Sequence, residues 1–194
     1  MGAIRHEGSA YKAILLQRTA GATSIIQMGM AFGVDPDTQR HGDVLVARTI
    51  FPYDDRVIRS DAAGAPIIDY SRTQRRKAKP ALVKLFERES NRGGHSFDTH
   101  VGTLLSGSAR IFCRRFRSDL VNAIPPARDP VIGGDMEGMG LLSVSPADRL
   151  LWAVVKGISD FADEDRDGII DMTRPLACTN AARFVLTALR NSLR

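Results

Sequence analysis

The most informative segment of this 194-residue chain is LWAVVKGISD, residues Leu151–Asp160. Its first half is apolar without strict alternation, which predicts a strand at Leu151–Gly157 that is buried on both faces. Ser159 and Asp160 follow closely, so two polar side chains should lie at the end of a buried strand. In sheets with parallel strands, ligands bind at the carboxyl ends of the strands. The segment therefore predicts a buried sheet and a candidate site in one place.

The rest of the chain alternates between apolar segments and segments with helical spacing. Further strands are predicted at 23–31, 42–47, 99–105 and 130–134, the first of them buried. Helices are predicted at 9–19, 80–89, 110–120, 136–144 and 176–193, with a hydroxyl of the turn 106–108 as cap of the third. The polar segment before Pro80 is expected to be a loop. This alternation predicts an α/β fold with a mostly parallel, mixed central sheet flanked by helices on both faces.

The composition is that of a globular protein. Hydrophobic residues make up 43% and charged residues 25% of the chain, which excludes a disordered tail, a collagen-like repeat and a coiled-coil rod. We therefore expect a single domain over residues 1–194. No window approaches the ~18 to 20 apolar residues of a membrane-spanning helix, so we expect a soluble, cytoplasmic protein with no membrane partner. Cys113 and Cys178 are predicted to be buried free thiols.

Positive charge is concentrated in two clusters. The chain has 27 Lys and Arg against 22 Asp and Glu, and the stretch 72–79 contributes strongly to this net charge of +5. A second cluster, at residues 114–117, has the spacing of the polar face of an amphipathic helix. A nucleic-acid footprint would also bring stacking aromatic residues, and only 6% of the chain is aromatic. We interpret both clusters as solvated surface and predict no nucleic-acid partner, with nucleic-acid binding by residues 72–79 as an alternative.

Two acidic residues are candidates for chemistry. Asp160 ends the apolar segment, and Glu137 follows the predicted strand at 130–134. Burial favours the protonated form of a carboxyl group, which a general acid requires, and a second carboxyl group in another environment can take a different role. From spacing alone, a helix cap or a loop hydrogen bond is the commoner role for a residue such as Asp160.

Five short motifs resemble one protein family in their order along the chain. They are MGMAFG at 28–33, GDVLV at 42–46, GTLLSG at 102–107, GDMEG at 134–138 and VKGISDFAD at 155–163. Together they resemble the purine nucleoside phosphorylase and methylthioadenosine nucleosidase superfamily. The resemblance implies a nucleoside phosphorylase-like fold and cleavage of the N-glycosidic bond of a purine ribonucleoside or nucleotide. It implies no metal and no organic cofactor.

The resemblance assigns the acidic residues to the two sides of the bond that breaks. Asp160, with Ser159 beside it, is expected to donate to purine N7, because negative charge develops on the departing base. Glu137 is expected to accept hydrogen bonds from the ribose 2′- and 3′-hydroxyls, which strengthen as the sugar becomes cationic. Met136 is expected to pack against the ribose, with simple core packing as the alternative.

The resemblance also implies a set of purine contacts. Ala31 and Phe32, in the glycine-rich motif, are expected to contact the substrate, and the backbone at Arg110 and Ile111 is expected to lie against the purine. Nucleosidases of this group commonly have an aromatic residue at the position of Arg110. Stacking on the purine would therefore use the guanidinium plane of Arg110 or the ring of Phe161.

The 5′ substituent of the substrate is left open by the sequence. An apolar pocket would suit a methylthio group. Lys156, together with Arg56 and Arg59, would instead favour a 5′-phosphate.

The glycine-rich motif distinguishes water from phosphate as the nucleophile. Phosphorolytic relatives resemble one another in an Arg two positions before the glycine and a Ser directly after it, because a phosphate needs a guanidinium and donors. Gln27 and Met30 occupy these positions here, and neither pairs with a dianion. Hydrolysis is therefore favoured. Phosphorolysis, with phosphate as co-substrate, and noncatalytic binding of a purine nucleoside are the alternatives.

Two further expectations come from the resemblance. In nucleosidases of the family an acidic residue on the first strand orients the water, and that strand is expected to be missing before Gly8. Glu7 matches no strand motif and receives no role. The segment Tyr53–Tyr70 is expected to contribute to a homodimer contact.

Residues 163–171, DEDRDGIID, raise the alternative of a calcium loop. Their spacing matches an EF-hand loop at its first, third, fifth, sixth and ninth positions. Arg174 stands where the bidentate Glu at position twelve would be, and Pro175 follows it. We therefore favour an acidic surface loop and predict no metal.

Overall fold

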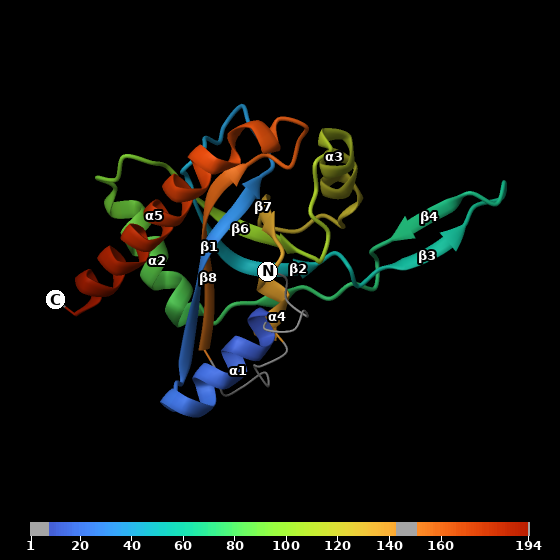
Figure 1. Cartoon of the computed structure of the whole chain (residues 1–194). Coiled ribbons are helices and arrows are strands. Elements are labelled where there is room, and N and C mark those ends of the chain that lie inside the picture. The colour runs from blue at the N-terminus through green and yellow to red at the C-terminus, as the bar shows by residue number, and fades with distance from the viewer. Residues whose placement is uncertain (1–7, 143–150, 194) are drawn as a thin grey trace.

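The computed structural model describes residues 8–142 and 151–193, and within these residues the main sheet has the strand order β5-β2-β6-β7-β1-β8 (Figure 1). The strands of this sheet are β1 (Ser24–Gly33), β2 (Val44–Pro52), β5 (Arg76–Lys77), β6 (Thr99–Ser106), β7 (Val131–Asp135) and β8 (Leu151–Asp160). A separate hairpin consists of β3 (Val57–Ser60) and β4 (Pro66–Asp69). The helices are α1 (Ser9–Ala20), α2 (Pro80–Arg92), α3 (Arg114–Ala123), α4 (Gly138–Leu142) and α5 (Arg166–Ser192). The predicted α/β class is confirmed.

The main sheet is mixed and curves back on itself. β2 pairs with β6, β6 with β7, and β1 with β8 in parallel, whereas β1 with β7, β2 with β5, and β2 with β8 are antiparallel. The β2–β8 pairing joins β8, at one end of this order, to β2, next to the other end, through residues such as Val46 and Val155. The sheet is therefore less parallel than the alternation of strands and helices suggested.

The carboxyl ends of four strands converge. β1 and β7 meet only at their last residues, where Phe32 lies opposite Gly134. β6 runs parallel to β7 and ends with Ser106 beside Asp135, and β8 runs parallel to β1 and ends at Asp160. This arrangement gathers the polar residues that end the strands at one edge of the sheet.

Helices α2 and α5 pack together over one face of the sheet (Figure 1). Phe86 of α2 and Phe184 of α5 are fully buried against Val44, Val46 and Val155. α2 follows the predicted pattern, with a proline in its first turn and its apolar face turned inward. The apolar segment at 151–155 forms the predicted strand, and Trp152, Val154 and Val155 are buried.

The segment before Pro80 is not only a loop. It contains the β3–β4 hairpin, which projects away from the sheet in Figure 1, and the short edge strand β5. Asp61 accepts hydrogen bonds from the backbone N–H groups of Ala63 and Ala65 at 2.8 Å each, and Gly64 has a φ of +84°. Four-residue strands joined by such a polar turn bury too little to leave an apolar pattern in the sequence.

The helix after β6 begins later than predicted. α3 starts at Arg114 and is capped by Cys113, whose Sγ accepts from the Phe116 N–H at 3.4 Å. The Ser108 N–H donates instead to Asp54 at 2.6 Å, and a Cβ at Gly107 would lie 2.2 Å from the ring of Tyr53. These contacts hold the chain after β6 outside a helix. The predicted cap at 106–108 is therefore wrong.

The last helix begins ten residues earlier than predicted, at Arg166, and contains Pro175. Proline lacks a backbone N–H and is therefore rare inside helices. For this reason the sequence pattern predicted no helix before Pro175. Residues 166–171 are helical rather than an extended calcium-binding loop. No group of three or more His, Cys, Asp or Glu suited to a metal ion occurs among the described residues.

Burial differs from expectation at several positions. Within β1 only the last three residues, Ala31–Gly33, are buried, whereas Met28 is 47% exposed. Cys113 and Cys178 are free as predicted, but both are exposed. Arg117, predicted to be solvated, is buried and donates to the carbonyl oxygen of Phe161 at 2.5 Å. The helices of the described ranges include none that is long and apolar enough to cross a membrane.

We expect the substitution Gly157→Ala to destabilise the fold, because β8 and α5 touch at this glycine. A Cβ at position 157 would lie 2.1 Å from the carbonyl oxygen of Ala177. Overpacking costs about 1–3 kcal/mol, and contact with backbone atoms places this variant near the upper value. Urea titration should show the corresponding loss in the free energy of unfolding.

Gly168→Ala, in the same helix, is the matched control. A Cβ at position 168 meets no atom within 4 Å, and alanine is favoured over glycine in helices by roughly 0.5–1 kcal/mol. This variant should be slightly more stable than the wild type. Equal stability of Gly157→Ala and wild type would contradict the close contact of β8 with α5.

Candidate active site

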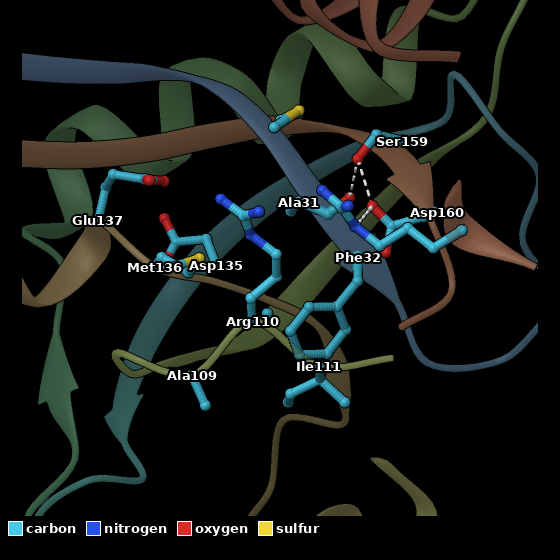
Figure 2. Close-up of a pocket in the computed structure, with 13 residues that line it drawn as sticks. Ala31, Phe32, Ala109, Arg110, Ile111, Asp135, Met136, Glu137, Ser159 and Asp160 are labelled. Atoms are coloured by element: carbon cyan, nitrogen blue, oxygen red, sulfur yellow. Dashed lines mark hydrogen bonds and ion pairs between the residues drawn. The ribbon is translucent and has the colours of Figure 1, made fainter. Parts of the chain in front are cut away.

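A pocket opens where the four strand ends converge (Figure 2). In Figure 2, Glu137 and Met136 lie toward one side of it and Ser159 and Asp160 toward the other, with the side chain of Arg110 between them. The two acidic residues of the sequence prediction therefore share one pocket. Its lining consists of Met30, Ala31, Phe32, Ala109, Arg110, Ile111, Gly134, Asp135, Met136, Glu137, Ser159, Asp160 and Arg166.

Asp160 is held in place as the last residue of β8. Its Oδ1 accepts from the Ala162 N–H at 3.0 Å, and its Oδ2 lies 2.7 Å from the hydroxyl of Ser159. Ala162 has a φ of +51°, so the chain turns sharply directly after the strand. The Ser159 hydroxyl is also 3.2 Å from the carbonyl oxygen of Ala31 on β1. The carboxyl group is thus buried and oriented by its own loop.

Arg166 is a site residue that the sequence analysis missed. Its Nε lies 3.4 Å from Oδ2 of Asp160, and its guanidinium group packs 5.0 Å from the ring centre of Phe112. The side chain is 11% exposed, so this ion pair is largely shielded from water. Its position in an acidic stretch made Arg166 look like one charge of a solvated loop. Its place at the start of α5, six residues after Asp160, is the feature that brings it to the pocket.

Glu137 is held by a buried ion-pair network. The ammonium group of Lys156 lies 2.9 Å from Oδ2 of Asp135 and 3.2 Å from Oε2 of Glu137. Complete burial disfavours the charged lysine, but the two carboxylates outweigh this effect, so the pKa of Lys156 is raised. The lysine therefore stays charged and fixes the Glu137 carboxylate, which is 25% exposed toward the pocket side.

Asp135 links this network to the neighbouring strand. Its Oδ1 accepts from the Ser106 hydroxyl at 2.8 Å and from the Gly138 N–H at 3.0 Å. The Ser106 oxygen in turn accepts from the Met139 N–H at 2.9 Å. These bonds hold the turn that carries Glu137 and Met136. The sequence analysis quoted Asp135 as part of a motif but gave it no role.

Eight of the ten predicted site residues line the pocket, and two do not. Phe161 is 7% exposed and packs under Gly33, with its ring centre 5.1 Å from that of His41. Lys156 is buried behind Glu137. The prediction that Lys156 binds a 5′-phosphate does not fit this geometry, because both carboxylates already occupy its ammonium group. Arg56 and Arg59 also lie outside the pocket lining.

The pocket offers two carboxyl groups in different environments. Asp160 is surrounded by a hydroxyl, a backbone N–H and a guanidinium group, whereas Glu137 is fixed by one buried ammonium group and faces the cavity. The environment of Asp160 is suited to transferring a proton to a substrate or to stabilising a negative charge that develops there. The second presents a fixed acceptor to hydroxyl groups.

The sequence of the chain is similar to that of a protein named as a nucleosidase. The chain is 28% identical over 180 residues to a death domain-containing ATP nucleosidase from Amphimedon queenslandica, a match that covers 84% of this chain and 32% of the relative. The chain thus spans about a third of the length of this curated relative.

Two solved structures show the same fold. A 5′-methylthioadenosine/S-adenosylhomocysteine nucleosidase from S. pneumoniae, bound to a transition-state inhibitor, aligns with a TM-score of 0.77 and 18% identity, over 97% of this chain and 77% of that chain. The futalosine hydrolase of Helicobacter pylori aligns with a TM-score of 0.74 and 18% identity, over 94% of this chain and 74% of that chain.

A family model assigns the chain. The model described as the phosphorylase superfamily matches residues 1–190, nearly the whole length of the sequence. The five motifs that suggested this family all lie within the match. By this match, the chain belongs to the phosphorylase superfamily.

Proposed function

We propose that the protein hydrolyses the N-glycosidic bond of a purine ribonucleoside or nucleotide. The observation that carries this proposal is that Glu137 and Asp160 line one pocket. Glu137 is fixed where it can accept hydrogen bonds from a sugar diol, and Asp160 lies toward the other side of the same space (Figure 2). The names of the relatives, which include nucleosidases and a hydrolase of nucleoside-like substrates, agree with this activity.

The chemistry follows from the charges that develop as the bond breaks. The bond between C1′ and the purine nitrogen breaks with its electron pair going to the purine, so the sugar becomes cationic and the base anionic. In the proposed mechanism protonated Asp160 gives its proton to N7 of the purine, and Arg166 and Ser159 hold the carboxylate that remains. The carboxylate of Glu137 binds the ribose 2′- and 3′-hydroxyls, and these hydrogen bonds strengthen as the sugar gains positive charge.

The pocket walls supply the remaining contacts of the proposal. Ala31, Phe32 and Ile111 offer apolar surface to the flat purine, and Met136 packs against the ribose. The guanidinium plane of Arg110 reaches the same space and can stack on the base.

Hydrolysis is favoured over phosphorolysis by the charges near Glu137. A phosphate dianion needs cationic donors, and Lys156, which contacts Glu137, already pairs with two carboxylates. Gln27 and Met30 bring no positive charge. Water is therefore the nucleophile in the proposal, and phosphorolysis is the competing outcome of the assay below.

We further propose an adenine nucleoside or nucleotide as substrate, in line with the ATP nucleosidase relative. Arg110 is exposed, lines the pocket and forms no ion pair with a described residue. With a 5′-phosphate substrate, Arg110 would pair with the phosphate, in place of Lys156, and would then not stack on the base. A homodimer that uses the projecting β3–β4 hairpin, where Ile58, Ile67 and Ile68 are exposed, and a cytoplasmic location remain predictions.

The direct test is release of free purine. Methylthioadenosine, adenosine, AMP and ATP would each be incubated with the protein, with and without inorganic phosphate, and the base and sugar products separated by chromatography. We expect adenine and a sugar with a free anomeric hydroxyl, independent of phosphate. Formation of ribose 1-phosphate would establish phosphorolysis, and binding without any base release would establish a noncatalytic module.

Asp160→Asn should abolish most of the activity, because an amide cannot deliver the proton that the departing base requires. General acid catalysis contributes about 10²–10⁴-fold, so kcat should fall by this factor. The amide also leaves Arg166 without its carboxylate partner, so the unfolding midpoint should fall as well, and urea titration checks that the variant is folded under the assay conditions. Asp171→Asn, an exposed change in α5, is the control and should keep full activity. Near-normal turnover by folded Asp160→Asn would refute the assigned role.

Arg166→Met should lower kcat by about tenfold or more, since a hydrogen bond to a charged group contributes roughly 1.5–3 kcal/mol. The variant loses the cation 3.4 Å from Asp160, and Arg166→Lys should recover part of the loss. Arg115→Met, at an exposed arginine of α3, serves as control. Steady-state kinetics would contradict the role if Arg166→Met and Arg115→Met behaved alike.

A further inference from the structure

A second large cavity lies beside the edge strand β5 and shares no lining residue with the pocket. It is a groove of about 790 Å³ between β2, the segment around β5, the first turns of α2 and residues 127–129 before β7. Five cations and two carboxylates line it, which leaves an excess of three positive charges. These charged residues are Arg48, Arg75, Lys77, Lys84, Glu87, Arg128 and Asp129. The proposed hydrolysis makes no use of this groove.

Both carboxylates of the groove are held by one arginine. Nε of Arg48 lies 2.6 Å from Oε1 of Glu87, and Nη1 of Arg48 lies 3.0 Å from Oδ1 of Asp129. These two ion pairs connect α2 to the segment before β7 across β2, so they hold the walls of the groove together. The three groups together carry one negative charge, and four cations remain around them.

The four remaining cations form no ion pair within the described part of the chain. They are Arg75, Lys77, Lys84 and Arg128. Arg75 is nevertheless fixed, because it donates to the carbonyl oxygen of Pro125 and its guanidinium carbon lies 5.2 Å from the ring centre of Phe51. Cations gathered in a cleft repel one another, and such a cleft raises the local concentration of anions. The groove is therefore suited to binding an anion.

The arrangement of the cations favours a compact anion with several charges. They come from separate segments and surround one concave space, whereas a nucleic-acid duplex presents its phosphates on a convex surface. A single strand would need aromatic side chains on which its bases stack, and the described lining of the groove contains no aromatic residue. Arginine binds phosphate through paired N–H groups, and lysine binds it as a point charge. A short phosphate chain fits these requirements.

We propose that this groove binds an oligophosphate, either free or as the phosphate chain of a nucleotide. Arg75 and Arg128 donate N–H groups to the phosphate oxygens, and Lys77 and Lys84 balance the remaining charge. A smaller pocket of about 210 Å³ adjoins the groove and shares Arg75 with it. Its wall is largely apolar and receives the organic part of the ligand when the phosphate chain belongs to a nucleotide.

Calorimetry with inorganic tripolyphosphate, at roughly physiological salt, tests the proposal. The wild-type chain should bind the probe at one saturable site. The double variant Lys84→Gln/Arg128→Gln should bind it about tenfold more weakly or worse, as expected for the loss of two partly exposed ion pairs. Neither side chain forms a hydrogen bond or ion pair with a described residue, so the thermal unfolding midpoint should stay at the wild-type value.

Two controls separate the groove from general attraction and from the pocket. Arg18→Gln/Arg183→Gln removes the same charge from exposed arginines of α1 and α5 outside the groove and should keep the wild-type affinity. Arg110→Gln removes the exposed cation of the pocket and should also keep it. Equal weakening in the two double variants, or weakening by Arg110→Gln alone, would overturn the proposal.

UTP distinguishes the two sources of the phosphate chain, and as a pyrimidine nucleotide it lies outside the proposed purine substrates. Tighter binding of UTP than of tripolyphosphate, weakened in the same way by Lys84→Gln/Arg128→Gln, would identify a nucleotide. Equal affinity would identify the phosphate chain alone. If neither probe binds saturably, the proposal is overturned, and binding of duplex RNA or an acidic peptide through Lys84 and Arg128 in that case would assign the groove to a macromolecule.

The result is independent of the proposed hydrolysis. Asp160→Asn should bind tripolyphosphate as tightly as the wild type does, because Asp160 does not line the groove. A wild type that releases no purine but binds the probe through Lys84 and Arg128 would refute the proposed function and support the oligophosphate site. A wild type that releases purine but binds neither probe would do the reverse.

Discussion

A lysine ammonium group that is almost completely removed from water fixes the geometry of the site. Lys156 is 2% exposed, and two carboxylates within 3.2 Å balance its charge. Removing one partner of a buried ion pair typically costs about 3–5 kcal/mol. Movements that separate Lys156 of β8 from Asp135 of β7, or from Glu137 in the turn after β7, are therefore unfavourable. Asp135 and Glu137 together balance the charge of Lys156, and the Glu137 carboxylate is still 25% exposed. The stability of the sheet and the position of Glu137 in the pocket therefore depend on the same three charges, those of Lys156, Asp135 and Glu137.

The convergence of strand ends turns this network into a pocket. β1 and β7 pair only at Phe32–Gly134 and Gly33–Gly133, so the strand ends that carry Asp135 and Asp160 open toward a common space. Closure of the sheet through β2 and β8 keeps these ends from spreading apart. The late start of α3 has the same result, because the non-helical segment before it leaves Arg110 and Ile111 to form one wall.

The parts of the structure that the sequence predicted are those with strong local signals. The apolar segment at 151–155 became the buried strand β8, and Pro80 began an amphipathic helix. Glu137 and Asp160 share a pocket, as the order of the motifs suggested. The features that were missed depend on tertiary contacts rather than on a local sequence pattern. Arg166 is a site residue because it pairs with Asp160. The apolar sequence of β1 does not indicate that only its last three residues are buried.

The long helix α5 has a mechanical consequence for the base-binding side of the site. Its 27 residues extend for roughly 40 Å at the usual rise per residue, from Arg166 at the pocket to the far end of α2. Ala177 rests directly on Gly157, and Pro175, just before this contact, lacks the N–H that would bond to the preceding turn. The backbone hydrogen bond that α5 lacks at Pro175 lies between the turns that begin with Arg166 and the part of the helix that packs against Gly157. The position of Arg166 beside Asp160 therefore depends on the first turns of α5 as well as on the seating of the rest of the helix on the sheet.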